Sequence, residues 1–130
     1  MPKLKRITPK DTQAKEAFAY TLIKWLKKRD LFEDVFLYVN GFRYSDSPSN
    51  DGQKIQIGDG IECYRSVCED PRKIVEYANP ELITMTFEGA LYHELNYGDG
   101  HTEKALNDLF EARGLYFEYG YAWSLSAYEN

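Results

Sequence analysis

The first quarter of the chain has the hydrophobic spacing of one long amphipathic helix. Between residues 9 and 29, apolar side chains and one threonine recur at intervals of three and four, which places them on one face of an α-helix. They are Ala14, Ala17, Phe18, Thr21, Leu22, Trp25 and Leu26. Thr8 is a suitable N-cap, and Pro9 suits the first helical position. The pattern predicts a helix over residues 9–29 whose apolar stripe packs on a sheet, with Lys15 off that stripe.

β-rich runs separated by turn formers follow this helix. Asn40-Gly41 lies between residues 35–39 and 42–44. This dipeptide suits the type I′ turn of a β-hairpin, because both central residues of that turn need positive φ. Shorter apolar alternation at residues 55–57 and a β-rich run at 61–67 predict a second hairpin.

The second half of the chain alternates short helices with strands. The pattern predicts a short helix from Asp70-Pro71 through Tyr77, a strand at 83–87, helices at 90–97 and about 102–113, and one or two strands from Leu115 onward, with a bulge or bend at Gly120. We therefore expect a single α+β domain over residues 1–130. Its mostly antiparallel sheet has about five or six strands, packed by the N-terminal helix and by shorter C-terminal helices.

Composition excludes several classes of protein. Hydrophobic residues make up 43% of the 130 residues and aromatic residues 15%, which is more than a disordered chain contains. The longest apolar run, residues 35–39, is far shorter than the roughly 20 residues of a membrane span. Cys63 and Cys68 have neither CxxC nor zinc-ligand spacing, which indicates a reducing compartment. We expect a cytoplasmic protein with no membrane segment.

The formal net charge of −5 conceals an uneven distribution. Residues 1–30 hold nine basic residues and three acids, a net of +6, and the remaining residues hold seven bases and eighteen acids, a net of −11. Residues 74–130 hold ten of these acids and only two bases. The sequence thus predicts a basic first helix and an acidic C-terminal half.

His93 and His101 are the main candidates for metal or catalytic chemistry. The segment from His93 begins like a zincin helix, but Tyr97 stands where the second histidine is required. The sequence contains no nucleophile elbow and no glycine-rich phosphate loop. We therefore expect no enzyme, no metal and no cofactor. A metal-dependent enzyme that uses His93 and His101 stays an alternative.

Acidic residues and tyrosines occur together in the C-terminal half, a composition that suits docking on a basic protein. Tyrosine is enriched among interface residues, and charge complementarity speeds association. The candidate partner-binding residues are Glu94, Asp99, Glu103, Asp108, Glu111, Tyr92, Tyr97 and Tyr116. We expect a protein partner with a basic surface. We do not expect direct nucleic-acid binding, because an acidic surface repels phosphate.

Four stretches of the sequence carry a resemblance to a known group of proteins. They are residues 7–20, LYVNGFRY at 37–44, MTFEGALYHELNYG at 85–98 and GLYFEYGYAWSLSAY at 114–128. In these stretches the chain resembles small proteins carried by mobile elements of Gram-positive and gut bacteria, a group that includes inhibitors of CRISPR nucleases. The resemblance implies a non-enzymatic inhibitor of a nucleic-acid-handling defence protein, of the anti-CRISPR or anti-restriction type. An immunity-type protein that neutralises a cognate toxin is the alternative.

Overall fold

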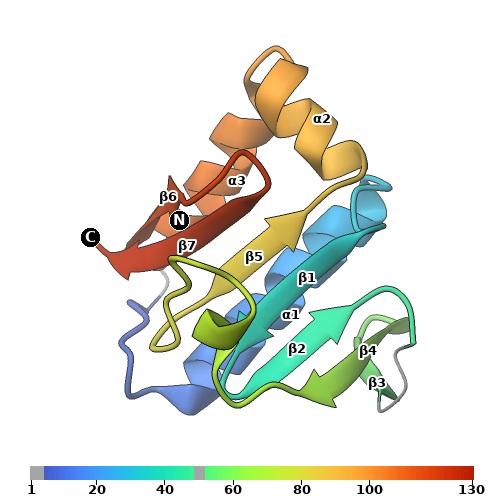
Figure 1. Ribbon diagram of the computed structural model, residues 1–130, viewed down its shortest axis with the longest axis vertical. Coiled ribbons are helices and arrows are strands. Elements are labelled where there is room, and N and C mark those ends of the chain that lie inside the picture. The colour runs from blue at the N-terminus through green and yellow to red at the C-terminus, as the bar shows by residue number, and fades with distance from the viewer. Residues whose placement is uncertain (1–4, 49–51) are drawn as a thin grey trace.

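The computed structural model describes residues 5–48 and 52–130, and these residues form three α-helices and one seven-stranded sheet (Figure 1). In chain order the elements are α1 (Thr12–Lys28), β1 (Val35–Val39), β2 (Phe42–Ser45), β3 (Gln53–Gly58), β4 (Ile61–Val67), a 3-10 helix (Pro71–Lys73), β5 (Thr84–Phe87), α2 (Ala90–Tyr97), α3 (His101–Glu111), β6 (Leu115–Tyr119) and β7 (Ser124–Glu129). The α+β fold class expected from the sequence is confirmed. None of the helices in these described ranges is long and apolar enough to cross a membrane.

All neighbouring strands of the sheet are antiparallel, in the order β3-β4-β2-β1-β5-β7-β6. The sheet has seven strands, so the expectation of five or six was too low. The additional strand comes from the tail, where β6 and β7 pair as a hairpin. Its turn is closed by two backbone hydrogen bonds, from Gly120 N to Ser124 O and from Ser124 N to Tyr121 O. The bend expected at Gly120 therefore separates two strands.

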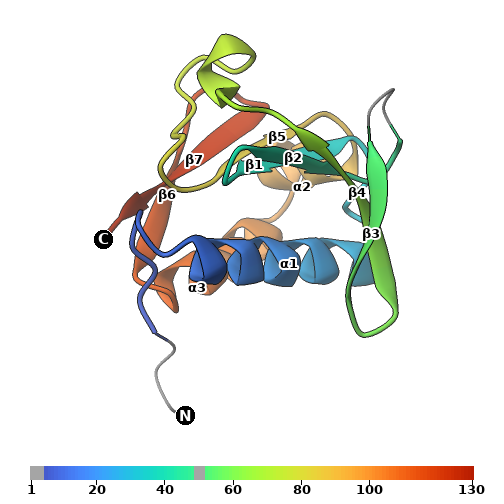
Figure 2. The same ribbon diagram turned by 90° about the horizontal axis from the view of Figure 1, so that it is seen from below.

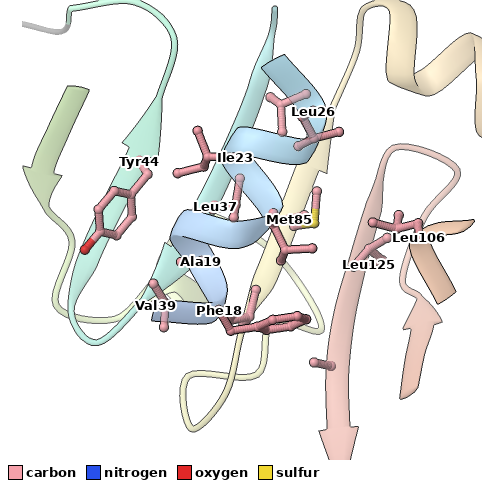
Figure 3. Packing of buried hydrophobic residues seen from close by; sticks show 14 of the residues in the cluster. Phe18, Ala19, Ile23, Leu26, Leu37, Val39, Tyr44, Met85, Leu106 and Leu125 are labelled. Carbon is pink, nitrogen blue, oxygen red and sulfur yellow. The ribbon is translucent and has the colours of Figure 1, made fainter. Parts of the chain in front are cut away.

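The two faces of the sheet are covered differently. Figure 2 shows α1 and α3 on one face, here called the helix face, and the segment that carries the 3-10 helix on the other, here called the outer face. Leu37 is aligned with Tyr44 on β2 and with Met85 on β5, so these three side chains all point to the helix face. Figure 3 shows Leu37 and Met85 beneath α1 and Tyr44 beside the helix on β2, and all three belong to the hydrophobic core.

Helix α1 begins later than the sequence predicted and buries a slightly different stripe. The side chain of Asp11 accepts a hydrogen bond from Ala14 N at 2.9 Å, so Asp11 replaces Thr8 as the N-cap and the helix starts at Thr12. Six residues of α1 are buried: Lys15, Phe18, Ala19, Leu22, Ile23 and Leu26. Ala17 and Thr21 of the predicted stripe are exposed, because the sheet covers a face rotated toward Ala19 and Ile23.

Lys15 is buried although the helical pattern placed it away from the stripe. Its side chain is 6% exposed, and its Nζ donates to Pro9 O at 2.7 Å and to Glu81 O at 3.1 Å. Burial lowers the pKa of this ammonium group. The lysine therefore connects the start of α1 to the chain just before β5.

Of two local predictions, the type I′ turn at Asn40-Gly41 is confirmed, and the helix from residue 70 to residue 77 is wrong. Asn40 and Gly41 have φ values of 55° and 79°, as a type I′ turn between β1 and β2 requires. The helix expected from residue 70 to residue 77 is only a 3-10 turn over Pro71–Lys73. After this turn the chain is hydrogen-bonded to the sheet: Asn79 N donates to Thr84 Oγ1 on β5, and Ser126 Oγ on β7 donates to Tyr77 O.

We expect Phe18→Ala to lower the free energy of unfolding by about 3–5 kcal/mol, the range for truncating a buried aromatic side chain. Phe18 is 1% exposed, and its ring meets that of Phe110 edge to face at 5.1 Å between centroids. Urea unfolding of the variant tests this value. Thr21→Ala on the exposed side of α1 is the control and should change stability by less than about 0.5 kcal/mol. A near-neutral Phe18→Ala would mean that α1 is peripheral to the core.

Tyr44 supplies a second test, because its hydroxyl is buried and has no hydrogen-bond partner among the described residues. Burial raises the pKa of this phenol to about 12. We expect Tyr44→Phe to leave the free energy of unfolding unchanged or to raise it by up to about 1 kcal/mol, because an unpartnered buried hydroxyl is unfavourable. Thr84→Val is the contrasting variant. The Thr84 hydroxyl is hydrogen-bonded to Asn79 N and Ser126 Oγ, so its loss should cost about 1–3 kcal/mol.

Candidate functional site

Seven of the eight residues predicted to bind a partner lie on α2, on α3 or in the turn between them. Tyr92, Glu94 and Tyr97 belong to α2, and Asp99 lies in the turn. Glu103, Asp108 and Glu111 follow on α3. Helices α2 and α3 contact each other, and Figure 1 shows both near one end of the sheet. These seven residues are called the α2–α3 surface below.

Three aromatic rings gather along α2: His93 and Tyr97 are exposed, and Tyr92 is partly buried against the core. The ring centroids of Tyr92, His93 and Tyr97 lie 5.9 to 6.1 Å apart, with the Tyr92 ring at a steep angle to each of the other two. Tyr97 is 74% exposed, the largest exposed fraction among the large hydrophobic side chains. Its phenol raises the pKa of Tyr92. This end of the helix therefore presents aromatic area to solvent next to acidic residues.

The turn between α2 and α3 is shaped by glycine and by short polar contacts. Gly100 has a φ of +92°, and a side chain on Gly98 would collide with the carbonyl oxygen of Glu94. Asp99 accepts a hydrogen bond from His101 N at 3.0 Å, and its other oxygen lies 3.1 Å from His101 Nδ1. Glu94 Oε2 accepts from Thr102 Oγ1 at 3.3 Å across the turn. These contacts hold the carboxylates of Glu94 and Asp99 at the junction of the two helices.

The acids of α3 differ in what they contact. Glu103 Oε2 accepts a hydrogen bond from the hydroxyl of Tyr119 on β6 at 2.5 Å. Asp108 pairs with Lys104 at 3.1 Å, one turn earlier on the same helix. Glu111 accepts from Asn107 Nδ2 at 3.0 Å. Residues 88–111 contain six acids and one lysine, and that lysine is already paired, so the surface is strongly negative.

Tyr116, the eighth predicted residue, does not lie on this surface. In β6 the side chains of Leu115, Phe117 and Tyr119 point toward the helix face, so Tyr116 points to the outer face. There its ring lies 5.7 Å from that of Tyr128 on β7. The sequence grouped Tyr116 with the acids of α3 because they are close along the chain, but the sheet lies between them.

Tertiary contacts compensate much of the positive charge of α1. Lys24 pairs with Asp59 at 3.5 Å, and Lys27 pairs with Asp46 at 3.4 Å. Lys15 is buried, so it adds little to the charged surface of the helix. Two lysines of the basic first helix predicted from the sequence therefore pair with acids of the β2–β4 region. On the α2–α3 surface, Lys104 is the one lysine within residues 88–111 that can compensate the negative charge.

The two histidines stand in separate settings. His93 lies in the aromatic group on α2, and His101 contacts Asp99 at the start of α3. Within residues 5–48 and 52–130, no three His, Cys, Asp or Glu side chains come together in a group that could hold a metal ion. Cys63 is buried, and burial raises the pKa of its thiol to about 11, so it is a protonated core residue, as expected.

The structure also reveals an aromatic group that the sequence prediction missed. On the outer face, the rings of Tyr121 and Trp123 stack at 5.1 Å, and Tyr77 lies 5.7 Å from Tyr121. The Tyr121 hydroxyl donates to Glu76 Oε2 at 2.5 Å. Strand alternation could have placed Tyr116 and Tyr128 on one face. Glu76 and Tyr77 join this aromatic group because they belong to residues 74–83, called the crossing segment below, which connect the 3-10 helix to β5. The crossing segment has no periodic hydrophobic pattern in the sequence.

Tyr119 should make stability depend on pH in the alkaline range. Partial burial, together with its bond to Glu103, raises the pKa of this phenol above the ordinary value near 10. A raised pKa in the folded state contributes stability below pH 10 that is lost as pH rises above it. We expect Tyr119→Phe to be destabilising at pH 7, and we expect its difference from the natural chain to shrink between pH 10 and 12.

Urea unfolding at pH 7, 10 and 11.5 measures this difference, and Glu103→Gln should reduce the same pH dependence in part because it removes the charge but keeps an acceptor. A Tyr119→Phe difference that stays constant across this range would contradict the role given to the pair.

The α2–α3 surface offers negative charge, exposed aromatic area and a turn shaped by Gly98 and Gly100. Exposed aromatic side chains are a feature of protein contact surfaces. Asn96 Nδ2 donates to Ala122 O at 2.9 Å and so fixes α2 to the β6–β7 turn. The surface is the basis of the functional inference, because no protein-family model, no curated protein and no solved structure matches the chain.

Proposed function

We propose that this chain is a non-enzymatic, cytoplasmic protein-binding module whose α2–α3 surface docks on a basic surface of a partner protein. The surface carries five carboxylates and two tyrosines on two short helices held together by the turn at Gly98–Gly100. In this proposal the carboxylates attract and orient the partner, and the tyrosines supply the area buried on contact. Long-range attraction raises the rate of association, and buried aromatic side chains prolong the complex.

The observation that carries the proposal is the exposure of Tyr97 inside an acidic field. Its side chain is 74% exposed, it belongs to a group of three aromatic rings, and carboxylates lie on both sides of it along the chain. Leaving a large aromatic side chain in water is unfavourable for the free protein, and binding removes that area from solvent. Tyrosine is enriched among the residues that contribute most to binding.

A channel or groove that binds nucleic acid is the class of partner that suits this surface best. Such sites are lined with lysine and arginine that neutralise phosphates, and a protein surface of the opposite charge can occupy the same site. The resemblance to small proteins of mobile elements supports the same assignment. We therefore propose an inhibitor of a nucleic-acid-handling defence protein, of the anti-CRISPR or anti-restriction type.

An immunity-type protein is the second candidate, because the same acidic surface suits a basic toxin equally well. The two candidates differ in the partner and share the surface. A complex with a nuclease or its guide assembly supports the first candidate, and a complex with a single small basic toxin supports the second. Affinity purification of the tagged chain from its host, followed by mass spectrometry, separates them.

We expect the double variant Asp108→Lys/Glu111→Lys to lose partner binding while its melting temperature stays nearly unchanged. Both side chains are exposed on α3. Within the described part of the chain, their ion pairs and side-chain hydrogen bonds are with Lys104 and Asn107 of the same helix, so they contribute little to folding. Glu103 stays unchanged in this variant because it holds Tyr119. The measurement is the yield of co-purified partner, read beside a thermal unfolding curve.

The matched control is Glu33→Lys/Glu69→Lys, which makes the same change in net charge at exposed acids outside the α2–α3 surface. This control should keep the partner. Equal loss of binding in both double variants would show that only net charge matters, and undiminished binding in the α3 variant would refute the proposed surface.

Tyr97→Ala should also weaken partner binding, by about 1–2 kcal/mol, without loss of stability.

A further inference from the structure

The open edge of strand β6 has a backbone arrangement suited to pairing with another strand. β6 pairs only with β7 among the described residues and ends the sheet on that side. Ala127 N donates to Ile83 O, toward β5, so its neighbours Ser126 and Tyr128 face β6. They are opposite Glu118 and Tyr116. The N–H and C=O groups of Phe117 and Tyr119 therefore point away from β7, to the open edge.

The two edges of the sheet are protected to different degrees. On β3 the register shifts between Gln56 and Gly58, and Lys54 lies exposed where it pairs with Glu62 at 3.0 Å. Irregular pairing and edge lysines are devices that discourage strand addition. The five residues of β6 include no lysine, no proline and no register shift. Residues 5–7 contact Arg113 and Asn130 beside the start of β6, so within residues 5–48 and 52–130 the open part of the edge is the stretch Phe117–Tyr119.

Each face of β6 has a hollow beside it. On the outer face, a hollow of about 250 Å³ is lined by Tyr77, Glu118, Tyr119, Gly120 and Tyr128. On the helix face, a hollow of about 260 Å³ lies between α3 and β6 and is lined by Gly100, Glu103, Lys104, Asn107, Phe117 and Tyr119. A strand added to β6 would direct successive side chains to opposite faces of the sheet. Its side chains would thus enter the two hollows alternately.

The linings of the two hollows indicate different occupants. The outer hollow combines the carboxylate of Glu118, which has no ion-pair partner among the described residues, with tyrosine rings, and none of its lining residues is basic. This combination suits an ammonium or guanidinium group, because a carboxylate and the faces of aromatic rings both attract cations. In the helix-side hollow, Glu103 and Lys104 are already engaged by Tyr119 and Asp108, and the half-buried ring of Phe117 forms one wall. An apolar side chain suits that position.

We propose that the open edge of β6 binds an extended segment of a partner protein by strand addition, and that this segment alternates basic and apolar residues. The backbone groups of Phe117 and Tyr119 provide the hydrogen bonds, and the two hollows select the side chains. The inference rests on the proposed function only for the basic character of the partner. The proposed contact lies on the edge of β6 and does not involve Asp108 or Glu111, which lie on the solvent side of α3.

The probe is a fluorescein-labelled nine-residue peptide that alternates arginine and valine, titrated against the full chain by fluorescence anisotropy. Three control peptides separate the contributions. The first has the same composition with all arginines before all valines, the second replaces arginine by glutamate, and the third carries N-methyl groups on alternate backbone amides. The alternating peptide should bind at least about tenfold more tightly than each control, a factor that corresponds to one good interaction.

Amide hydrogen exchange locates the peptide on the fold. With the alternating peptide bound, the amides of Phe117 and Tyr119 should exchange at least about tenfold more slowly, because each becomes a donor to the added strand. The amides of β3 should be unaffected. Protection on β3, or protection of neither edge, would overturn the assignment to β6.

A pair of substitutions at one position separates the backbone contribution from the side chain. Tyr119→Ala and Tyr119→Pro both remove the phenol, but only proline also removes the N–H group at the open edge. Proline is tolerated on an edge strand where its nitrogen faces solvent. Tyr119→Pro should bind the peptide about fivefold more weakly than Tyr119→Ala, the effect of one net hydrogen bond. Equal affinities in two folded variants would overturn strand addition.

Glu118→Lys keeps the test decisive if proline destabilises the chain. It should weaken binding of the arginine–valine peptide about tenfold and improve binding of the glutamate peptide. Unchanged affinities for both peptides would exclude the outer hollow as the cation site. A chain that instead dimerises through β6, seen as a concentration-dependent mass in sedimentation, would also refute the proposal, because the occupant would then be a second copy. None of these results depends on the α3 variant, so failure here leaves the α2–α3 surface to its own test.

Discussion

The edge-to-face contact between Phe18 and Phe110 joins the two helices that cover the sheet, and much of the remaining structure depends on it. Phe18 belongs to α1 and Phe110 to α3, the two helices that Figure 2 shows on the helix face of the sheet. Phe110 also packs against Phe117 of β6 at 5.2 Å, so one chain of aromatic rings runs from the first helix to the last hairpin. Helix α3 also contacts β6 and α2, so the ring pair connects α1 to the part of the fold that carries the carboxylates of α3. The stability of the core and the shape of the candidate surface therefore have a common origin.

The outer face of the sheet is organised by polar contacts instead of a second helix layer. The Thr84 hydroxyl accepts from Asn79 N and contacts Ser126 Oγ, which donates in turn to Tyr77 O. These bonds hold the crossing segment, with the buried side chain of Val75, against β5 and β7. A buried hydroxyl group costs less free energy when it has a hydrogen-bond partner than when it has none. The crossing segment supplies those partners, and it brings Tyr77 to the hollow beside Glu118.

Charge is distributed in space differently from its distribution along the chain. Three of the four lysines of α1 lose much of their exposed charge: Lys15 is buried, and Lys24 and Lys27 pair with acids of the β2–β4 region, whereas Lys28 is exposed. The acids of α2 and α3 have one lysine near them in sequence, Lys104, which forms an ion pair with Asp108. Among the described residues, no lysine or arginine of another element forms an ion pair with the acids of α2 and α3. That contrast is why we propose docking at the α2–α3 surface and the adjoining edge of β6.

Local sequence determined most of the elements, and tertiary structure decided which of their faces matter. The turn at Asn40-Gly41, the strand alternation at 83–87 and the helix over residues 90–97 follow from backbone preferences and short-range periodicity, which act within a few residues. The buried face of α1 did not follow, because a helix with apolar residues on adjoining sides is oriented by the sheet it packs on. The grouping of Glu103 with Tyr119, the separation of Tyr116 from the acids, and the open edge of β6 depend on strand order and register. Those are set by contacts between residues far apart in the chain, which no local pattern records.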